Sequence, residues 1–123
     1  MIQGVVNSAY EPIVSITVQG PGGQAREIEA VIDTGFSEFL TLPPALVAEL
    51  RLLPVTSASA ILANGSEVIF DVCRGTVLWD GHPRHIDVYV SDATPLVGMR
   101  LLDRHNLSIQ VRAGGRVVIQ AGE

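Results

Sequence analysis

The residues best placed to do chemistry are Asp33, Thr34 and Gly35, which directly follow the apolar segment 28–32. An aspartate at the end of a buried strand costs free energy unless its carboxylate is hydrogen-bonded or serves a function. Gly35 lets the backbone turn sharply, and the Thr34 hydroxyl can bond to another stretch of backbone. The tripeptide alone recurs by chance and would also suit a structural turn, in which the aspartate caps local N–H groups. Its role therefore depends on the elements around it.

Short strands and tight turns surround the tripeptide. Apolar and polar residues alternate over 14–18 and again over 28–32, which is the period of a half-buried strand. The Gly-Pro-Gly-Gly run at 20–23 provides the turn between them. Further along, Ala63-Asn64-Gly65-Ser66 predicts a hairpin between strands 58–62 and 67–72, because Asn and Gly tolerate positive φ.

The remaining segments continue this pattern. One helix is expected to open at Pro43-Pro44 and to present an apolar face as far as Leu53, with Pro54 ending it. A second short helix is expected from Gly98 towards His105. Four more strands are expected at 76–79, 85–90, 108–111 and 116–120. The succession predicts an all-β fold, a small closed barrel with one or two short helices, in a single domain over residues 1–123.

Composition and charge argue against several classes of partner. The net charge is −5, and all eight positive residues are arginines scattered singly along the chain, whereas a nucleic-acid binder carries clustered basic residues. No apolar stretch approaches the ~20 residues that cross a membrane. The single cysteine, Cys73, cannot form an internal disulfide and is expected to pack in the core. We therefore expect neither a nucleic-acid nor a membrane partner, and a cytoplasmic location.

The chain resembles the retropepsin-like aspartic proteases, in particular their small stand-alone prokaryotic members. Residues 31–43 read V-I-D-T-G-F-S-E-F-L-T-L-P and are similar to the family's active-site loop and the strand after it. Ala63-Asn64-Gly65 stands where the family has its flap hairpin, and Pro95-Leu96-Val97-Gly98-Met99 resembles the motif of two hydrophobic residues and a glycine. The resemblance extends from about 13 to 119 and implies the retropepsin-like acid-protease barrel.

The resemblance implies an aspartic endopeptidase with Asp33, Thr34 and Gly35 as catalytic residues. Peptide hydrolysis needs a general base to activate water and a general acid to protonate the leaving amide. Two carboxylates about 3 Å apart repel by about 5 kcal/mol at an effective dielectric constant near 20, so the pair keeps one shared proton. The chain holds a single D-T-G, and a homodimer would supply the second carboxylate from its twin Asp33. The expected partners are a second copy and a peptide or protein substrate.

The resemblance also assigns roles around the aspartate. Thr34 would bond to the opposite chain's loop, the hairpin tip Ala63-Asn64-Gly65 would close over substrate, and Phe36 would contact it. Phe36 departs from the Ser or Ala of many relatives, which puts the pH optimum in doubt because phenylalanine offers the carboxylate no hydrogen bond. Apolar residues near Phe36, Leu62 and Leu96 favour hydrophobic substrate side chains.

Other interpretations stay open at this point. A catalytically silent dimeric module could use the same groove to bind peptide, and the Asn64-Gly65 turn could be an ordinary surface hairpin. His82, His85 and His105 lack metal-ligand spacing, so neither a metal nor a cofactor is expected. Glu38 and Asp33 could in principle form the carboxylate pair of a glycosidase, but the strand context and the family resemblance argue against this. Trp79 suits the core or a dimer interface equally well.

Overall fold

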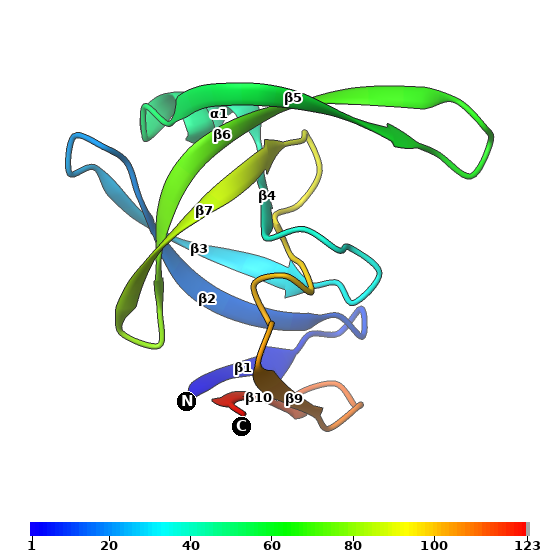
Figure 1. Ribbon diagram of the computed structural model, residues 1–123. Helices are drawn as coiled ribbons and strands as arrows, with labels where there is room; N and C mark the ends of the chain where they lie inside the picture. Colours follow the sequence, from blue (N-terminus) through cyan, green and yellow to red (C-terminus); the bar gives the residue numbers. More distant parts are fainter. Residues whose placement is uncertain (123) are drawn as a thin grey trace.

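The structure is a computed structural model that describes residues 1–122, and these residues form ten strands and one short helix (Figure 1). In chain order the elements are β1 (Ile2–Val6), β2 (Pro12–Gln19), β3 (Ala25–Ile32), β4 (Leu40–Leu42), α1 (Pro44–Glu49), β5 (Leu53–Ile61), β6 (Glu67–Trp79), β7 (His82–Val90), β8 (Leu96–Val97), β9 (His105–Ile109) and β10 (Arg116–Ala121). The predicted all-β class is confirmed.

Six of the strands close into a ring. The strands β2, β3, β8, β4, β7 and β6 follow one another in the ladder, and β2 pairs with β6 as well as with β3. Most neighbours are antiparallel, but β8 runs parallel to β3, and β4 runs parallel to β7. The two-residue strand β8 therefore lies between β3 and β4 and joins the two sides of the ring.

Two extensions leave the ring on opposite sides (Figure 1). On one side, β5 and the first half of β6 form a long hairpin that projects beyond the body; we call residues 53–72 the flap hairpin. On the other side, β1, β10 and β9 continue the sheet from β2 and include the first and last strands of the chain. The ring thus separates a projecting arm from a terminal layer.

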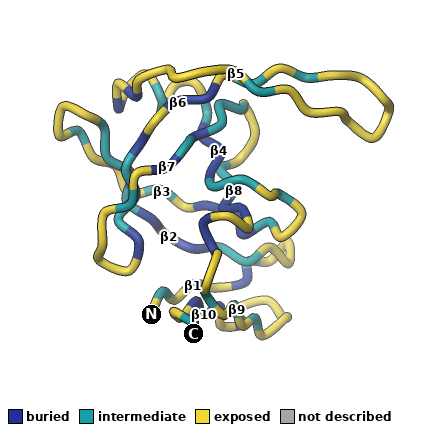
Figure 2. The backbone as a smooth tube through the Cα atoms, viewed as in Figure 1, coloured by how far each residue is buried: buried dark blue, intermediate teal, exposed yellow. Residues whose placement is uncertain are grey.

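The core fills the ring and is aliphatic, because alternate residues of each strand face inward. Val18, Leu40, Val77, Val88 and Val97 are completely buried, and Figure 2 shows the buried positions gathered in the ring strands. Burial of one such side chain contributes roughly 1.5–3 kcal/mol. The strands that end at the predicted site are consequently among the best-anchored parts of the chain.

Cys73 and Trp79 both belong to this core. The prediction that Cys73 packs inside is confirmed, and burial raises the pKa of its thiol, with the Asp71 carboxylate adding to the effect. Trp79 is buried within the single chain, and its indole Nε1–H donates to Nε2 of His105 at 3.2 Å. The sequence allowed Trp79 to lie either in the core or at a dimer interface, and in the structure it lies in the core of the single chain.

The first predicted helix forms but is shorter than expected. It begins at Pro44 and ends at Glu49, and Arg51 then adopts a φ of 55° that turns the chain away from helical geometry. Leu53, which the apolar spacing assigned to the helix face, is instead the first residue of β5. The sequence prediction placed the end of the helix too late because β5 also begins with an apolar residue, which continues the helical spacing beyond the turn.

The second predicted helix, from Gly98 towards His105, does not form. Residues 99–104 make successive turns with bonds between residues three apart, such as the Leu101 N–H to the Gly98 carbonyl at 3.2 Å. Arg104 has a φ of 64°, which redirects the chain into β9. His105 therefore opens a strand, where it accepts the Trp79 hydrogen bond, and does not end a helix.

Each predicted strand corresponds to a strand of the structure, but the bounds differ: the strand predicted at 108–111, for example, is β9 and runs from His105 to Ile109. Neither β1 nor β8 was predicted from the sequence. The segments predicted separately at 67–72 and 76–79 are parts of the single strand β6. Its inner half pairs with β2 and β7 in the ring, whereas its outer half pairs with β5 in the flap hairpin. One strand therefore links the buried body to the projecting arm.

Candidate active site

Asp33 lies immediately after β3, next to the buried Ile32. Its backbone N–H donates to the carbonyl of Val97 at 2.9 Å, and its carbonyl accepts the N–H of Phe36 at 3.1 Å. Its carboxylate Oδ1 accepts the N–H of Gly35 at 2.9 Å. The residue is half-buried, so the main chain is fixed while the carboxylate can still meet water or another group.

The active-site loop, residues 33–38, rests on the segment that follows β8. The N–H of Met99 donates to the carbonyl of Phe36 at 2.8 Å. A Cβ atom added to Gly98 would lie 2.0 Å from the carbonyl oxygen of Glu38 and 2.6 Å from the Phe36 ring. Only glycine fits this position, and the segment therefore packs directly beneath the loop.

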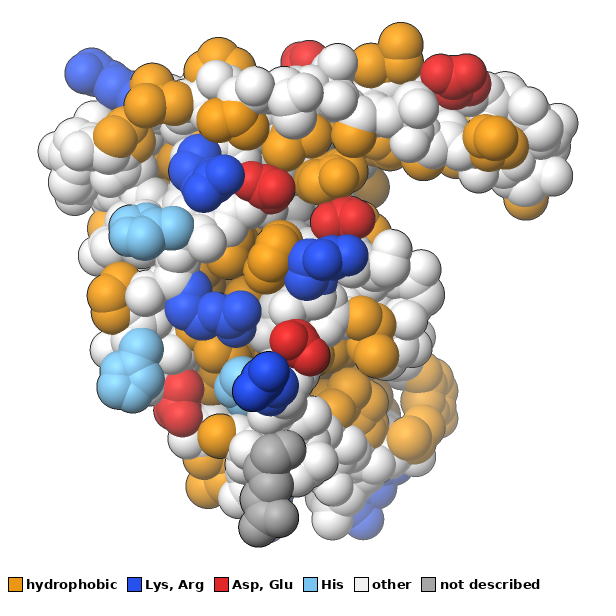
Figure 3. All heavy atoms as spheres, in the orientation of Figure 1, with side chains coloured by type: hydrophobic (Ala, Val, Ile, Leu, Met, Phe, Trp, Pro, Cys, Tyr) orange, Lys and Arg blue, Asp and Glu red, His pale blue; other side chains and the backbone are white. Residues whose placement is uncertain are grey.

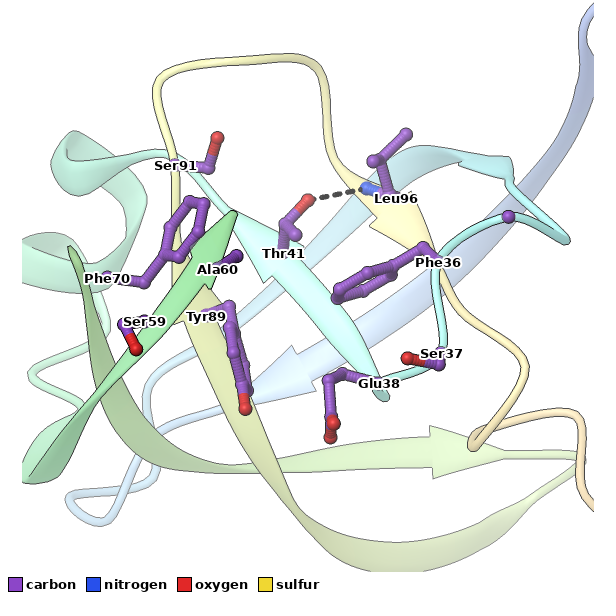
Figure 4. A pocket seen from close by; sticks show the side chains of 11 residues that line it. Phe36, Ser37, Glu38, Thr41, Ser59, Ala60, Phe70, Tyr89, Ser91 and Leu96 are labelled. Atoms are coloured by element: carbon purple, nitrogen blue, oxygen red, sulfur yellow. Dashed lines mark hydrogen bonds between the residues drawn. The ribbon is translucent and has the colours of Figure 1, made fainter. Parts of the chain in front are cut away.

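Thr41 supports the same site, although the sequence analysis did not single it out. It is buried in β4, and its Oγ1 accepts the backbone N–H of Leu96 at 2.9 Å (Figure 4). Its own backbone pairs with Tyr89 in β7. The available signal was a polar residue inside the apolar run Leu40-Thr41-Leu42, but threonine is common in strands of every kind.

A cavity of about 370 Å³ opens between the active-site loop and the two strands of the flap hairpin. Three rings form its walls: Phe36 from the loop, Phe70 from β6 and Tyr89 from β7 (Figure 4). The Tyr89 ring lies 6.1 Å from each of the other two, measured between centroids. The other lining residues are Gly35, Ser37, Glu38, Thr41, Ser59, Ala60, Ser91 and Leu96. The cavity can hold a bulky side chain.

Two polar groups stand at one side of the cavity. The Glu38 carboxylate and the Tyr89 hydroxyl point the same way in Figure 4, and Glu38 Oε2 lies 3.5 Å from Nε of Arg100. Burial raises the pKa of the Tyr89 phenol, and the carboxylates of Glu38 and Asp87 raise it further, while Arg100 opposes them. The phenol therefore keeps its proton at neutral pH and can donate a hydrogen bond.

Comparison with known proteins identifies the fold. No protein-family model and no curated protein matches the chain. Among solved structures, a retropepsin-like aspartic protease from Rickettsia conorii is similar, at 16% identity and a TM-score of 0.58, with 99% of this chain and 91% of that one covered. EIAV protease, solved with the inhibitor HBY-793, is similar at 18% identity and a TM-score of 0.56, with 78% and 88% covered. The chain has the retropepsin-like fold.

Within this retropepsin-like fold, the predicted catalytic residues stand together while the predicted flap residues stand apart from them. Ala63, Asn64 and Gly65 form the exposed tip of the flap hairpin, and none of them lines the cavity. The hairpin meets the cavity through Ser59, Ala60 and Phe70, which lie on its two strands before the turn. A role for the tip in substrate binding stays a prediction, whereas Phe36, also predicted to contact substrate, does line the cavity.

The predicted hairpin turn is present at the flap tip, with a positive φ at Gly65 but not at Asn64. Gly65 adopts a φ of 84°, and Asn64 Oδ1 accepts both the N–H of Ser66 at 2.9 Å and its hydroxyl at 2.6 Å. The N–H of Leu62 completes the turn by donating to the Ser66 carbonyl at 2.8 Å. The tip is thus a locally ordered turn on an arm that the body does not cover.

The Thr34 side chain is exposed, and its hydroxyl makes no hydrogen bond within residues 1–122. No hydrogen bond within these residues takes the place of the bond to a second chain that we predicted for this hydroxyl. That bond stays a prediction. The described part of the chain contains no group of three or more His, Cys, Asp or Glu side chains that could hold a metal ion. It also contains no helix long and apolar enough to cross a membrane.

Proposed function

We propose that this chain is an aspartic endopeptidase whose active site forms when two copies bring their Asp33 carboxylates together. The observation that carries the proposal is the half-buried Asp33 at the end of β3, beside a cavity, in a chain with the retropepsin-like fold and a single D-T-G. The likeness to solved aspartic proteases supports the fold, and the chemistry of the site supports the activity.

Two Asp33 carboxylates with one shared proton would supply both halves of the reaction. The ionised carboxylate takes a proton from water as the water oxygen attacks the peptide carbonyl carbon. The protonated carboxyl donates its proton to the peptide nitrogen as the C–N bond breaks, which leaves a carboxylic acid and an amine. One carboxylate cannot hold and lack the proton at the same moment, so the lone Asp33 of a single chain is half of the machinery.

The strand register brings several loops to the end of the molecule that carries Asp33. β2 begins opposite the end of β3, with Ile13 paired to Val31, so loop 7–11 lies beside Asp33. The N–H of Gly114 donates to the carbonyl of Val6 at 2.8 Å, so the β9–β10 loop lies at the same end of the sheet. Several loops therefore form one face around the aspartate.

Exposed apolar side chains occupy these loops and the turns that follow β8. Tyr10 is 66% exposed, Val111 is 76% exposed, and Met99, whose backbone supports the active-site loop, is 48% exposed. Large exposed apolar residues that cluster on one face favour a protein–protein contact. A two-fold axis through this face would bury them and join the two Asp33 residues, and it would give the free Thr34 hydroxyl a partner in the other copy.

The remaining assignments belong to the same proposal. Thr34 bonds to the partner's loop, Gly35 shapes the loop by donating its N–H to Asp33, and Phe36 contacts the substrate from the cavity wall. The tip residues Ala63, Asn64 and Gly65 close over a bound peptide. The chain acts as a single domain, in the cytoplasm, on extended peptide segments.

The proposal is tested by incubating the protein with a diverse peptide mixture between about pH 4 and pH 8, beside the Asp33→Asn variant. We expect cleavage by the wild type and a loss of about a thousandfold or more in the variant, because a neutral amide cannot accept the water proton. Sedimentation velocity should show a dimer whose formation parallels activity. Equal cleavage by both proteins, or full activity from a strict monomer, would falsify the proposal.

A further inference from the structure

The cavity beside Asp33 contains one acidic side chain, Glu38, on otherwise neutral walls. Its surroundings are the rings of Phe36, Phe70 and Tyr89 together with small polar or aliphatic residues. An isolated carboxylate in such a pocket would attract a substrate side chain with a positive charge, because partial burial strengthens charge–charge interactions relative to water. The preference of the pocket therefore depends on whether the Glu38 charge is free or already balanced.

Arg100 forms an ion pair with Glu38. Its Nε lies 3.5 Å from Glu38 Oε2, and its backbone N–H donates to the Glu38 carbonyl at 3.3 Å. The guanidinium carbon lies 6.0 Å from the centre of the Phe39 ring, close enough for a cation–π contact. These three contacts hold Arg100 against Glu38 from outside the cavity, since Arg100 itself does not line it.

We infer that Arg100 is a specificity-determining residue that neutralises Glu38 and so sets the pocket to accept uncharged, bulky substrate side chains; the inference rests on the proposed peptidase function. A substrate lysine would have to lose water to enter the pocket and would meet a carboxylate whose charge is already compensated. A phenylalanine, tyrosine or leucine loses little on leaving water and packs against the aromatic walls. The cavity volume of about 370 Å³ accommodates all three.

Removing the arginine should then convert the pocket to one that favours cations. In Arg100→Met the side chain keeps an apolar stem over Phe39 but loses its charge, which leaves the Glu38 carboxylate free to pair with a substrate lysine or arginine. A new charge-assisted hydrogen bond at a partly exposed site corresponds to a change of about five- to tenfold in selectivity. The effect requires Glu38, so Glu38→Gln in the same protein should abolish it.

The experiment compares peptide pairs that differ only by phenylalanine or lysine at each position near the scissile bond. The measured quantity is the ratio of kcat/KM for the lysine peptide to that for the phenylalanine peptide. We expect this ratio to rise about five- to tenfold in Arg100→Met and to return to the wild-type value in Glu38→Gln/Arg100→Met. Arg26→Met is the matched control, because Arg26 pairs with Glu49 away from the cavity and its loss should leave the ratio unchanged.

A second readout separates this inference from the proposed function. The same peptide pairs are titrated against the Asp33→Asn forms of each protein, and the two dissociation constants are compared by fluorescence polarisation. If no protein cleaves any peptide, the peptidase proposal fails, and the ratio of dissociation constants alone decides the role of Arg100. A ratio that does not move in Arg100→Met, or that stays raised in the double variant, overturns the inference. Thermal unfolding checks that each variant is folded.

Discussion

The ring and the flap hairpin flank the same cavity but are built in opposite ways. In the ring, Leu40, Val88 and Val97 are completely buried, and the strands that carry them pair on both sides. In the flap hairpin, β5 pairs with β6 alone, and Ile61 and Ile69 are 79% and 70% exposed. Figure 3 shows this arm standing clear of the body above a notch.

The difference teaches which part of the site is preset and which must respond. Asp33 and its loop lie on the ring, where backbone hydrogen bonds and the core fix the strands. The flap hairpin gains little from burial beyond its base, so its outer part has little free energy of its own to hold one position. A catalytic carboxylate needs a rigid support such as the ring. A segment that covers the substrate must instead move so that peptides can enter and leave, as a weakly held hairpin can.

The largest expected contrast comes from one alanine substitution in each region. At Gly98, directly after the ring strand β8, a new Cβ would lie 2.0 Å from the backbone oxygen of Glu38, so the active-site loop must shift. We expect Gly98→Ala to lower the free energy of unfolding by about 3 kcal/mol or more. At Gly65 in the flap tip nothing lies within 4 Å, and Gly65→Ala should cost only about 1 kcal/mol, from its positive φ.

Denaturant unfolding measures both changes in free energy. The comparison requires that the two variants have the same dependence of unfolding free energy on denaturant concentration. Peptide cleavage adds a second readout, since the Gly98 variant should lose activity wherever the loop carrying Asp33 has moved. If both substitutions lowered the free energy of unfolding equally, the ring would accommodate a new side chain as readily as the flap hairpin does. The contrast between the two regions would then be wrong.

A smaller contrast comes from two threonines. Thr41→Val in the ring removes the acceptor for the partly buried N–H of Leu96, which should lower the free energy of unfolding by about 1–3 kcal/mol. Thr56→Val in the flap hairpin removes only an exposed 3.3 Å bond to the Ser57 carbonyl and should change stability by less than about 0.5 kcal/mol. Thermal unfolding of the two variants, side by side, checks the difference. A stable Thr41→Val protein would show that the hydroxyl is not needed to position β8.

The parts of this molecule that could be predicted from sequence are those that local chemistry specifies. Alternating apolar residues placed β2 and β3, and the Asn64-Gly65 turn placed the flap hairpin, because period-two patterning and positive φ are properties of a few neighbouring residues. The D-T-G at 33–35 was found for the same reason. Its position at a strand end follows from the strand before it.

Long-range placement was not predictable in the same way. The cavity joins Phe36, Phe70 and Tyr89 from three separate segments, and no short-range pattern relates them. The expected helix after Gly98 failed because local spacing does not show that Met99 is held by the carbonyl of Phe36. The pairing of Glu38 with Arg100 likewise depends on the loop and the turns meeting across the fold.

The smallest expected change in stability, and the sharpest test of the flap hairpin, is the variant Ile61→Ser/Ile69→Ser. Both side chains are mostly exposed in the free chain, so their loss should change the free energy of unfolding by less than about 0.5 kcal/mol. If the hairpin covers bound peptide, the same change should lower kcat/KM about fivefold, because apolar surface is then buried only in the complex. Leu53→Ser is the matched control: Leu53 is an exposed residue at the other end of β5 and lines no part of the cavity. A loss of stability without a loss of activity would place these isoleucines in the fold of the free protein and remove the hairpin from the catalytic cycle.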